Sequence, residues 1–455
     1  MAKVLLIMPR LPQKMGAPYI GQQYVASSLL KDGHEVRCVD LAAARFTGSK
    51  EDAVTMAESW SPDMIGMTLF TQNAADGYGL AKRVRPATRL LVAGGPHATV
   101  CPDEVLGFGF DVAVLGEGEL AVVELARWLD DGSKEAPPKV AGCYGQGIQG
   151  TPASPIENLD ELPFPFESYP CFDAKAYSPT STVVTGGLVT SRGCPARCTF
   201  CANYVTGRWH RWRSAANVVA EMVNLREKYH TTHFPIWDDA FTASRSRVAE
   251  LCDAILAEPA LGGVTWTCIT PANMVKFNDL AFMRKAGCVA INFGIESGDE
   301  NILKAIKKGQ RPDQVKQSVK AAKAEGMTTI VNFMCGFPEE GVKELDNTID
   351  LMRALADNTD VFNHRGVLVP FPGTVIYDQN HAKFGFTGWW LDSKYVPDEP
   401  NLFELDPLEA QEYLEHDPTL DLDFFHYSDK VREKIAECVL YKARHNQRST
   451  GMIQA

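Results

Sequence analysis

The 455-residue sequence has no apolar run that approaches the roughly 20 residues needed to cross a membrane as a helix. Its start, Met1–Pro9, has no long apolar segment followed by small residues at a cleavage site, so we expect a first strand there and no signal peptide. No repeat at solenoid spacing and no low-complexity tract is visible. These absences predict a cytoplasmic protein with no membrane partner.

Basic residues are also few. There are 45 Lys and Arg against 57 Asp and Glu, which gives a formal net charge of −12. Between Asp398 and Asp429 there is no Lys or Arg at all, which is typical of a solvated acidic surface. The charge balance argues against a nucleic-acid partner. One stretch, Arg208–Arg213, is basic with interleaved Trp, as nucleic-acid surfaces often are. We interpret it instead as part of a barrel rim or cofactor pocket.

Residues 1–135 alternate short apolar runs with segments of helical period, which predicts a doubly wound parallel sheet of flavodoxin type. The length of the chain is too great for one ordinary core, so at least one further domain is expected. The expected strands are Lys3–Met8, Glu35–Asp40, Asp63–Phe70, Arg89–Gly94 and Asp111–Leu115. The expected helices are Tyr19–Leu30, Ala74–Val84 and Glu119–Leu129.

Three of these strands end in small, polar or glycine-rich loops. Ligands of open α/β sheets bind at such carboxyl ends, where glycine lets a bulky group approach the backbone. Three consecutive loops of this kind predict a large, flat cofactor. The loop residues expected to contact it are Thr68, Leu69, Phe70, Thr71, Gln72, Gly94, Gly95, His97, Gly116, Glu117 and Gly118.

A proline-rich segment, 136–182, is expected to be an ordered linker. Strand and helix alternate again over 183–385, which predicts a partial or full (β/α) barrel with its chemistry on the loops at the strand ends. Residues 386–455 are expected to form a small, mostly helical region. The six barrel strands are expected at Leu188–Arg192, Thr232–Trp237, Val264–Ile269, Val289–Ile295, Thr328–Met334 and Phe362–Val369.

Cys194, Cys198 and Cys201 follow the first of these barrel strands closely. Thiolates on so short a loop can converge on one metal centre, and three of them would leave the fourth iron of a 4Fe–4S cubane open for a ligand. The alternatives are a structural zinc site, which would want a fourth Cys or His in a tight pair, and coincidence. We predict the cluster.

With Phe200 before its last cysteine, this spacing resembles the signature of the radical S-adenosylmethionine (SAM) superfamily. Flanking motifs resemble one branch of it, the enzymes with an N-terminal cobalamin-binding domain. These motifs are Val189–Gly193, Trp212–Ser214, Trp237–Phe241, Gly294–Gly298 and Gly336–Pro338, and upstream Leu91–Thr99, Gly116–Glu119 and Leu159–Pro165. The resemblance covers about residues 3–375 in the expected order.

The resemblance implies three cofactors: a 4Fe–4S cluster, SAM and cobalamin. It also implies an external electron donor of flavodoxin or ferredoxin type. The residues that it places at SAM are Phe200, Asp238, Glu296, Ser297 and Asn332. Many relatives carry an Arg where this chain has Thr270–Asn273, and Pro271 cannot supply a guanidinium to the SAM carboxylate.

The first half has no Asp-x-His-x-x-Gly motif of the kind that coordinates cobalt through histidine. We interpret His97 as a loop residue that packs on the corrin and does not ligate the metal. The lower face of cobalt is then covered by the loop Leu69–Asn73.

The function predicted from these features is a cobalamin-dependent radical SAM methyltransferase that acts on an unactivated carbon of a small molecule. Radical ring contraction, cyclisation or hydration without methylation shares the same architecture and stays open. A cobalamin-binding sensor with a degenerate barrel is a third interpretation, and the intact cysteine triad argues against it. The segment from Trp389 to Tyr427 is expected to shape the substrate pocket.

Overall fold

The computed structural model describes residues 1–46, 48–131, 139–145, 153–177, 187–363, 367–396, 399–400, 405, 407–415 and 418–450. Parts of the predicted linker 136–182, of the last predicted strand 362–369 and of the acidic run 398–429 lie outside these ranges.

The chain divides into two compact units that are not contiguous in sequence. The first contains Met1–Gly186 together with two short segments, Ala202–Gly207 and Gly388–Phe403. The second contains the remaining stretches, Gly187–Cys201, Arg208–Thr387 and Glu404–Ala455. The chain therefore leaves the second unit twice, once directly after Cys201 and once after Thr387.

The first unit is built on a six-stranded sheet in the order β2-β1-β3-β4-β5-β6. Its first five strands are parallel, and β6 pairs antiparallel with β5 at the edge. The strands are β1 (Lys3–Met8), β2 (Glu35–Asp40), β3 (Met64–Thr68), β4 (Leu90–Gly94), β5 (Val112–Val114) and β6 (Cys143–Gly145).

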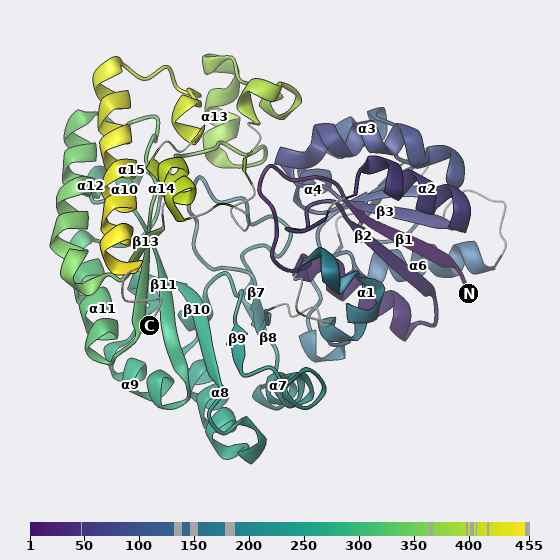
Figure 1. Ribbon diagram of the computed structural model, residues 1–455, viewed down its shortest axis with the longest axis horizontal. Coiled ribbons are helices and arrows are strands. Elements are labelled where there is room, and N and C mark those ends of the chain that lie inside the picture. The colour runs from purple at the N-terminus through teal and green to yellow at the C-terminus, as the bar shows by residue number, and fades with distance from the viewer. Residues whose placement is uncertain are drawn as a thin grey trace. The chain divides into compact units, whose positions relative to one another are not determined.

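Helices cover both faces of this sheet (Figure 1). Helices α1 and α6 pack together, as do α2 and α3. Strand β1 is apolar along most of its length and fully buried from Val4 to Met8, as expected for a parallel strand covered on both sides. The prediction of a doubly wound parallel sheet is confirmed. The helices are α1 (Ile20–Lys31), α2 (Lys50–Trp60), α3 (Ala74–Val84), α4 (Pro96–Val100), α5 (Pro102–Gly107) and α6 (Glu119–Asp130), and the 3-10 turns are η1 (Thr71–Asn73), η2 (Arg85–Ala87), η3 (Leu159–Glu161), η4 (Pro165–Cys171) and η5 (Ala174–Ala176).

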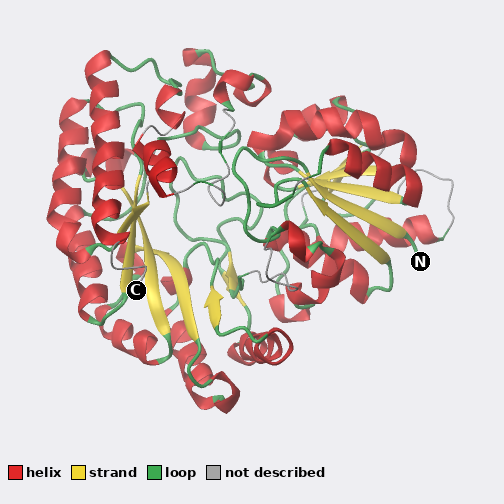
Figure 2. Cartoon of the chain, viewed as in Figure 1, coloured by secondary structure: helices red, strands yellow, loops and turns green. Residues whose placement is uncertain are grey.

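The second unit has a parallel five-stranded sheet in the order β13-β12-β11-β10-β9. A parallel bridge between Leu188 and Ile236 adds the first predicted barrel strand beside β9. Figure 2 shows these strands with helices along their outer side, which is a partial barrel and confirms that part of the prediction. The strands are β7 (Ser191–Arg192), β8 (Arg211–Trp212), β9 (His233–Pro235), β10 (Thr265–Pro271), β11 (Cys288–Glu296), β12 (Thr328–Phe333) and β13 (Val361–Asn363).

Helices of the second unit follow the strands in turn, and the C-terminal region is helical, as predicted. Its last helix, α15, packs against α12 and β13 (Figure 1). The helices are α7 (Ala215–Tyr229), α8 (Arg245–Ala257), α9 (Phe277–Lys285), α10 (Glu300–Ala305), α11 (Pro312–Ala324), α12 (Val342–Leu355), α13 (Val375–Phe384), α14 (Pro407–Glu415) and α15 (Asp429–Thr450). The 3-10 turns are η6 (Phe241–Ala243), η7 (Pro259–Leu261), η8 (Ala272–Met274), η9 (Ala356–Asn358) and η12 (Pro418–Asp421), while η10 (Trp389–Leu391) and η11 (Ser393–Tyr395) belong to the first unit.

Side chains on the barrel strands alternate between a covered and an open face. On β12, Val331 and Phe333 are buried while Asn332 is half-exposed. Strand β11 carries Asn292 and Gly294, also half-exposed, and the strand register pairs Gly294 with Asn332. The open face of the sheet is therefore polar near the carboxyl ends of its central strands.

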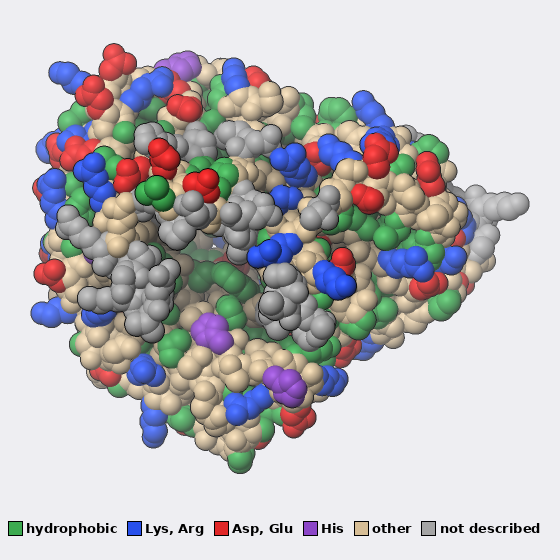
Figure 3. Space-filling model, viewed as in Figure 1, with side chains coloured by type: hydrophobic (Ala, Val, Ile, Leu, Met, Phe, Trp, Pro, Cys, Tyr) green, Lys and Arg blue, Asp and Glu red, His purple; other side chains and the backbone are tan. Residues whose placement is uncertain are grey.

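No helix in the described part of the chain is long and apolar enough to cross a membrane. On the face of the molecule in Figure 3, basic and acidic side chains are interspersed.

Candidate active site

Cys194, Cys198 and Cys201 lie on the loop that follows β7, and none of them is in a disulfide. The loop begins at Gly193, whose φ of +84° is a left-handed conformation that glycine adopts without strain. Cys194 and Cys198 are half-buried and Cys201 is exposed. One short segment therefore carries three cysteines that are at least partly exposed to solvent.

The centre of this cysteine loop is anchored to two other parts of the barrel. The Thr199 N–H donates to the Ile306 carbonyl at 3.0 Å, directly after α10. The Ile376 N–H, in α13, donates to the Thr199 carbonyl at 3.1 Å. Phe200 packs edge-on against Phe337, with ring centroids 5.9 Å apart. The protein's own contacts therefore fix the position of the loop.

Asp238 clamps the strand that leads into the cysteine loop. Its Oδ1 accepts from the Thr190 and Ser191 N–H groups at 2.6 and 2.9 Å, and its Oδ2 accepts from both hydroxyls at 2.6 and 2.7 Å. Arg247 adds an ion pair at 3.0 Å. The carboxylate is buried and its oxygens are fully engaged. This favours a positioning role for Asp238 over the direct SAM contact that the sequence resemblance implies.

Glu296 and Lys308 form a buried ion pair beside the cysteine loop. The Lys308 Nζ lies 2.6 Å from Glu296 Oε1 and 5.8 Å from the centre of the Phe200 ring. Glu296 has a φ of +73° at an irregularity in the pairing of β11 with β12. A non-glycine residue in this conformation is uncommon and strained, and such strain clusters at functional sites. A Cβ at Gly294 would lie 3.0 and 3.1 Å from the two charged atoms, so a larger residue there would require the pair to shift by a few tenths of an ångström.

The charge of Lys308 acts on the thiols. Burial raises the pKa of the Cys194 and Cys198 thiols. At Cys198 the Lys308 cation is the largest opposing effect, whereas at Cys194 its effect on the pKa is smaller than those of the Ala196 backbone and of Asp239. Burial alone would lower the pKa of Lys308, but Glu296 and the thiols of Cys198 and Cys201 outweigh it and raise the pKa. Lys308 is therefore a stable cation next to three groups that must lose their protons to bind metal.

The donor set fits a 4Fe–4S cluster. Three thiols on one anchored loop, with a buried cation beside them, suit the negatively charged thiolates that such a cluster requires. Among the described residues, no three Cys, His, Asp or Glu side chains come together closely enough to hold a single metal ion. That separation is compatible with a cubane, in which each thiolate binds a different iron.

Two other residues expected at SAM have partners within the barrel. The Ser297 hydroxyl lies 3.2 Å from that of Thr348 and accepts from the Asp299 N–H at 3.1 Å, so it holds the turn after β11. Asn332 donates to the Asn292 side chain and stays half-exposed on the open face of the sheet. Their contacts with SAM stay predictions.

Lys308 and Gln310 are the buried polar residues of this region that the sequence patterns did not single out. They lie in the turn between α10 and α11, and the Gln310 Nε2 donates to the Ile295 carbonyl at 2.7 Å. The only local signal is Gly309 between them, which marks a turn but not the direction of the side chains on either side.

In the first unit, the predicted ligand loops after β3 and β4 are neighbours. Thr68 pairs with Gly94, the Leu69 N–H donates to the Gly94 carbonyl at 2.8 Å, and the His97 N–H donates to the Leu69 carbonyl at 3.0 Å. Gly95 has a φ of +92°, and a Cβ there would lie 2.8 Å from the Leu69 carbonyl oxygen. Glycine is therefore required where the two loops meet.

The loop after β5 joins the same edge of the sheet. The Gly116 N–H donates to the Thr99 hydroxyl at 3.1 Å, and Gly116 has a φ of +80°. Glu117 is buried and accepts from the Ile156 N–H at 2.7 Å, so it has a structural partner. A Cβ on Gly94 would meet no atom within 4 Å, which leaves open space above this edge. Loops of backbone and glycine at the carboxyl ends of parallel strands fit a large, flat cofactor such as cobalamin.

His97 lies inside the first unit. Its Nε2 is 2.9 Å from the Tyr78 hydroxyl and 3.2 Å from Glu104 Oε1, and its Nδ1 is 3.3 Å from the Thr71 hydroxyl. The ring is fully buried and packs edge-on against Trp390 at 5.3 Å. Both ring nitrogens have partners inside the unit, and the expectation that His97 packs on the corrin without ligating cobalt stays a prediction.

The basic stretch 208–213 is largely built into the barrel. Arg211 and Trp212 form β8, which pairs with β7 ahead of the cysteine loop. Arg213 is buried in an ion pair with Glu221 of α7. Arg211 is buried as well and its guanidinium lies 5.6 Å from the Trp209 ring. These contacts match the rim role expected for the stretch.

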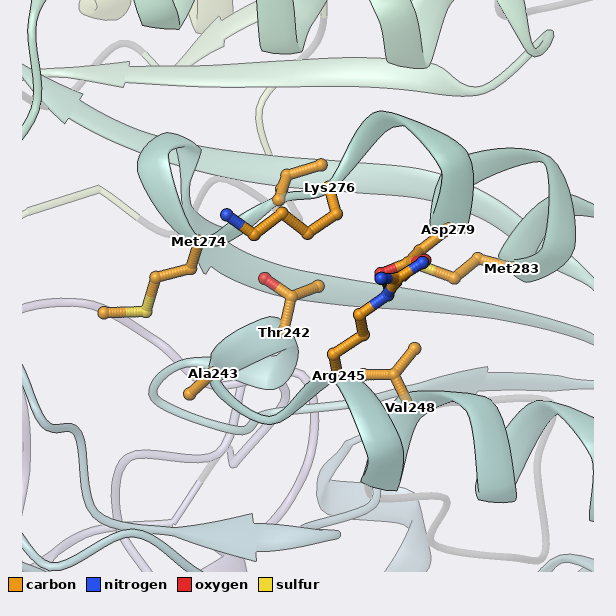
Figure 4. Close-up of a pocket in the computed structure, with 9 residues that line it drawn as sticks. Thr242, Ala243, Arg245, Val248, Met274, Lys276, Asp279 and Met283 are labelled. Carbon is orange, nitrogen blue, oxygen red and sulfur yellow. Dashed lines mark hydrogen bonds and ion pairs between the residues drawn. The ribbon is translucent and has the colours of Figure 1, made fainter.

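A cavity of about 230 Å³ lies between η6, η8 and the first turns of α8 and α9 (Figure 4). The Arg245 guanidinium bonds Asp279 at 2.9 and 3.1 Å on one side of it, and Met274 and Lys276 line another. None of the predicted cofactor residues lines this cavity.

Comparisons with known proteins agree with both halves of the chain. The family model of the Radical SAM superfamily matches residues 188–352, and that of the B12 binding domain matches residues 15–126. An uncharacterised methyltransferase of Pyrococcus horikoshii is 31% identical over 391 residues, which are 83% of this chain and 82% of that protein. The chain belongs to the cobalamin-dependent radical SAM enzymes.

Other relatives of this cobalamin-dependent radical SAM enzyme differ in what they are named for. A cytidylyl-2-hydroxyethylphosphonate methyltransferase of Streptomyces wedmorensis is 29% identical, over 73% of this chain and 72% of that protein. An anaerobic magnesium-protoporphyrin IX monomethyl ester cyclase of Rubrivivax gelatinosus is 27% identical, over 70% and 58%. The names of the relatives therefore include a cyclase as well as methyltransferases.

The fold of the enzyme matches that of the radical SAM methyltransferase TsrM from Kitasatospora setae, solved with cobalamin and a 4Fe–4S cluster. The TM-score is 0.69 at 19% identity, over 97% of this chain and 89% of that chain. Family membership gives the enzyme three cofactors: a 4Fe–4S cluster, SAM and cobalamin. Cys194, Cys198 and Cys201 are the residues that would hold the cluster.

Proposed function

We propose that this enzyme moves a methyl group from SAM, by way of cobalamin, to an unactivated carbon of a small-molecule substrate. The observation that carries the proposal is that one chain combines two features. The second unit has an anchored cysteine loop, and the first unit has three neighbouring strand-end loops that suit cobalamin. The methyltransferases among its relatives support it.

When bound, the cluster with SAM supplies a hydrogen-abstracting radical, and cobalamin supplies a transferable methyl group. The residues of this chain position these groups. Asp238 and Thr199 hold the cysteine loop at its start and its middle. Glu296 and Lys308 place charge beside the thiols. Gly95 lets the loops after β3 and β4 meet closely, and Gly94 leaves open space beside them.

The test is a product balance with the full chain, reconstituted with iron, sulfide and cobalamin and supplied with SAM, a reductant and candidate metabolites. A methyltransferase should consume two molecules of SAM per turnover, with S-adenosylhomocysteine and 5′-deoxyadenosine released in equal amounts. The product should gain the mass of one methylene group, and deuterium from the labelled substrate carbon should appear in 5′-deoxyadenosine.

The alternative function is a radical reaction without methylation, which the cyclase relatives favour. That reaction would release 5′-deoxyadenosine with no S-adenosylhomocysteine and no methylene gain, and such a result would exclude methyl transfer. In either case we propose that the electron comes from an external flavodoxin- or ferredoxin-type donor. Reduced flavodoxin should then replace the chemical reductant in the assay.

A further inference from the structure

Lys308 is held in place by the backbone on both sides of it. Lys307 before it has a φ of +53° and Gly309 after it has a φ of +71°. The Lys308 N–H donates to the Leu303 carbonyl at 2.9 Å, which closes the turn after α10. Lys307 is exposed while Lys308 is only 8% exposed, so the turn directs one of two adjacent lysines inward. A left-handed residue and a hydrogen bond of this kind are a common ending of a helix, and here they direct the side chain of Lys308 toward the interior.

The side chain of Lys308 lies beside the cysteine loop. Ile306, two residues earlier, accepts the hydrogen bond from Thr199 at the centre of that loop. The Lys308 ammonium then reaches the ring of Phe200, which lies between Cys198 and Cys201 in the sequence. The position of the cation is thus tied to the loop at two points.

Glu296 holds the Lys308 ammonium, with 2.6 Å between Lys308 Nζ and Glu296 Oε1. The same ammonium lies 5.8 Å from the centre of the Phe200 ring, between Cys198 and Cys201 in the sequence. The cation therefore lies against the segment that carries two of the three cysteines, and the carboxylate of Glu296 lies directly behind it.

A positive charge beside a cluster, such as that of Lys308, favours the reduced form of the cluster, which carries one more electron. Adding an electron to a cluster held by three thiolates makes a negative assembly more negative, and the energy of that step depends on nearby charges, hydrogen bonds and burial. In a poorly solvated site the effect of such a charge is weakly screened.

We propose that Lys308 is a positioning residue that sets the reduction potential of the 4Fe–4S cluster, raising it through its charge, and that Glu296 both holds Lys308 in place and limits the effect. The proposal concerns the step that loads the electron and holds whether or not the enzyme methylates its substrate.

The test is a potentiometric titration of the reconstituted full chain, in which electron paramagnetic resonance follows the reduced cluster. Four variants are compared with the parent enzyme: Lys308→Met, Lys308→Arg, Glu296→Gln and, as a matched control, Lys307→Met. Iron content checks that each variant holds its cluster. The midpoint potential should fall in Lys308→Met, rise in Glu296→Gln, stay near the parent value in Lys308→Arg and not move in Lys307→Met.

Opposite shifts from the two partners of one ion pair are the signature of an electrostatic role, because a purely structural role would move both variants in the same direction or neither. Equal potentials in Lys308→Met and the parent, or shifts of the same sign in Lys308→Met and Glu296→Gln, would overturn the proposal. Should Lys308→Met fail to hold the cluster, Glu296→Gln decides: a higher potential supports the proposal and an unchanged one contradicts it.

Discussion

The cysteine loop of the second unit and the glycine loops of the first are built from different kinds of groups. At the glycine loops the ionisable side chains are used internally: His97, Tyr78 and Glu104 bond one another, and backbone and glycine line the edge. At the cysteine loop the ionisable groups remain beside the ligand position, with three thiols next to Lys308 and Glu296. In the first site, backbone and glycine face the expected ligand position. In the second site, thiols and a buried ion pair face it.

The largest effect should come from removing a thiol. Cys198→Ala should lose the cluster and all cleavage of SAM, because the remaining two thiolates cannot hold a cubane that has no fourth protein ligand. Iron and sulfide analysis after anaerobic reconstitution should find about four of each in the parent chain. Cys101→Ala, at a half-buried cysteine of the first unit, should keep them. An intact cubane in Cys198→Ala would refute the assignment of the ligands.

The next effect concerns the clamp under the cysteine loop. Asp238→Ala leaves the buried Arg247 guanidinium unpaired, which should lower the free energy of unfolding by about 3–5 kcal/mol. The matched control is Asp279→Ala, which breaks the pair with the exposed Arg245 and should cost about 0–1 kcal/mol. Chemical denaturation of both variants measures the difference. Equal losses would show that Asp238 is not part of a buried network and would remove its positioning role.

Sequence patterns predicted the outline of both sites but not their interior. The alternation of apolar runs with helical periods was enough to predict the two sheets. The spacing of Cys194, Cys198 and Cys201 indicated one accessible loop, and its role as the cluster ligand stays a prediction. The burial of His97 was not visible, because its partners Tyr78, Glu104 and Trp390 come from three different elements, α3, α5 and η10, whose packing the sequence does not show. Lys308 was missed for a similar reason, since the direction of its side chain depends on the backbone at Lys307. No local sequence pattern predicts that Ala202–Gly207 and Gly388–Phe403 belong to the first unit.

The smallest expected effect is at the glycine loops. Gly95 has φ +92° and ψ −176°, a region that only glycine occupies readily, so Gly95→Ala should cost about 1–3 kcal/mol and displace the Leu69 backbone. Where this destabilisation is larger in the cobalamin-bound protein than in the free protein, the affinity for cobalamin falls. A difference of about 1.4 kcal/mol corresponds to a factor of ten, so we expect a drop of about tenfold or more. Titration with cobalamin, followed by its absorption spectrum, measures this change.

The control for that prediction is Gly79→Ala in α3, where a Cβ meets no atom within 4 Å. Because alanine is favoured over glycine in a helix by about 1 kcal/mol, this variant should be slightly more stable and bind cobalamin normally. Should Gly95→Ala bind as well as Gly79→Ala, the Gly94–His97 loop would not be part of the cobalamin site.

The most direct test of the contrast between the two sites is electron paramagnetic resonance of the full chain loaded with both metal cofactors. The account predicts a Co(II) signal without superhyperfine splitting from an axial nitrogen, because the described loops offer shape but no histidine to the metal. It also predicts, after reduction, a cluster signal that changes when SAM is added, because three thiolates leave one iron open. Nitrogen splitting at cobalt that is lost in His97→Ala, or a cluster signal indifferent to SAM, would contradict it.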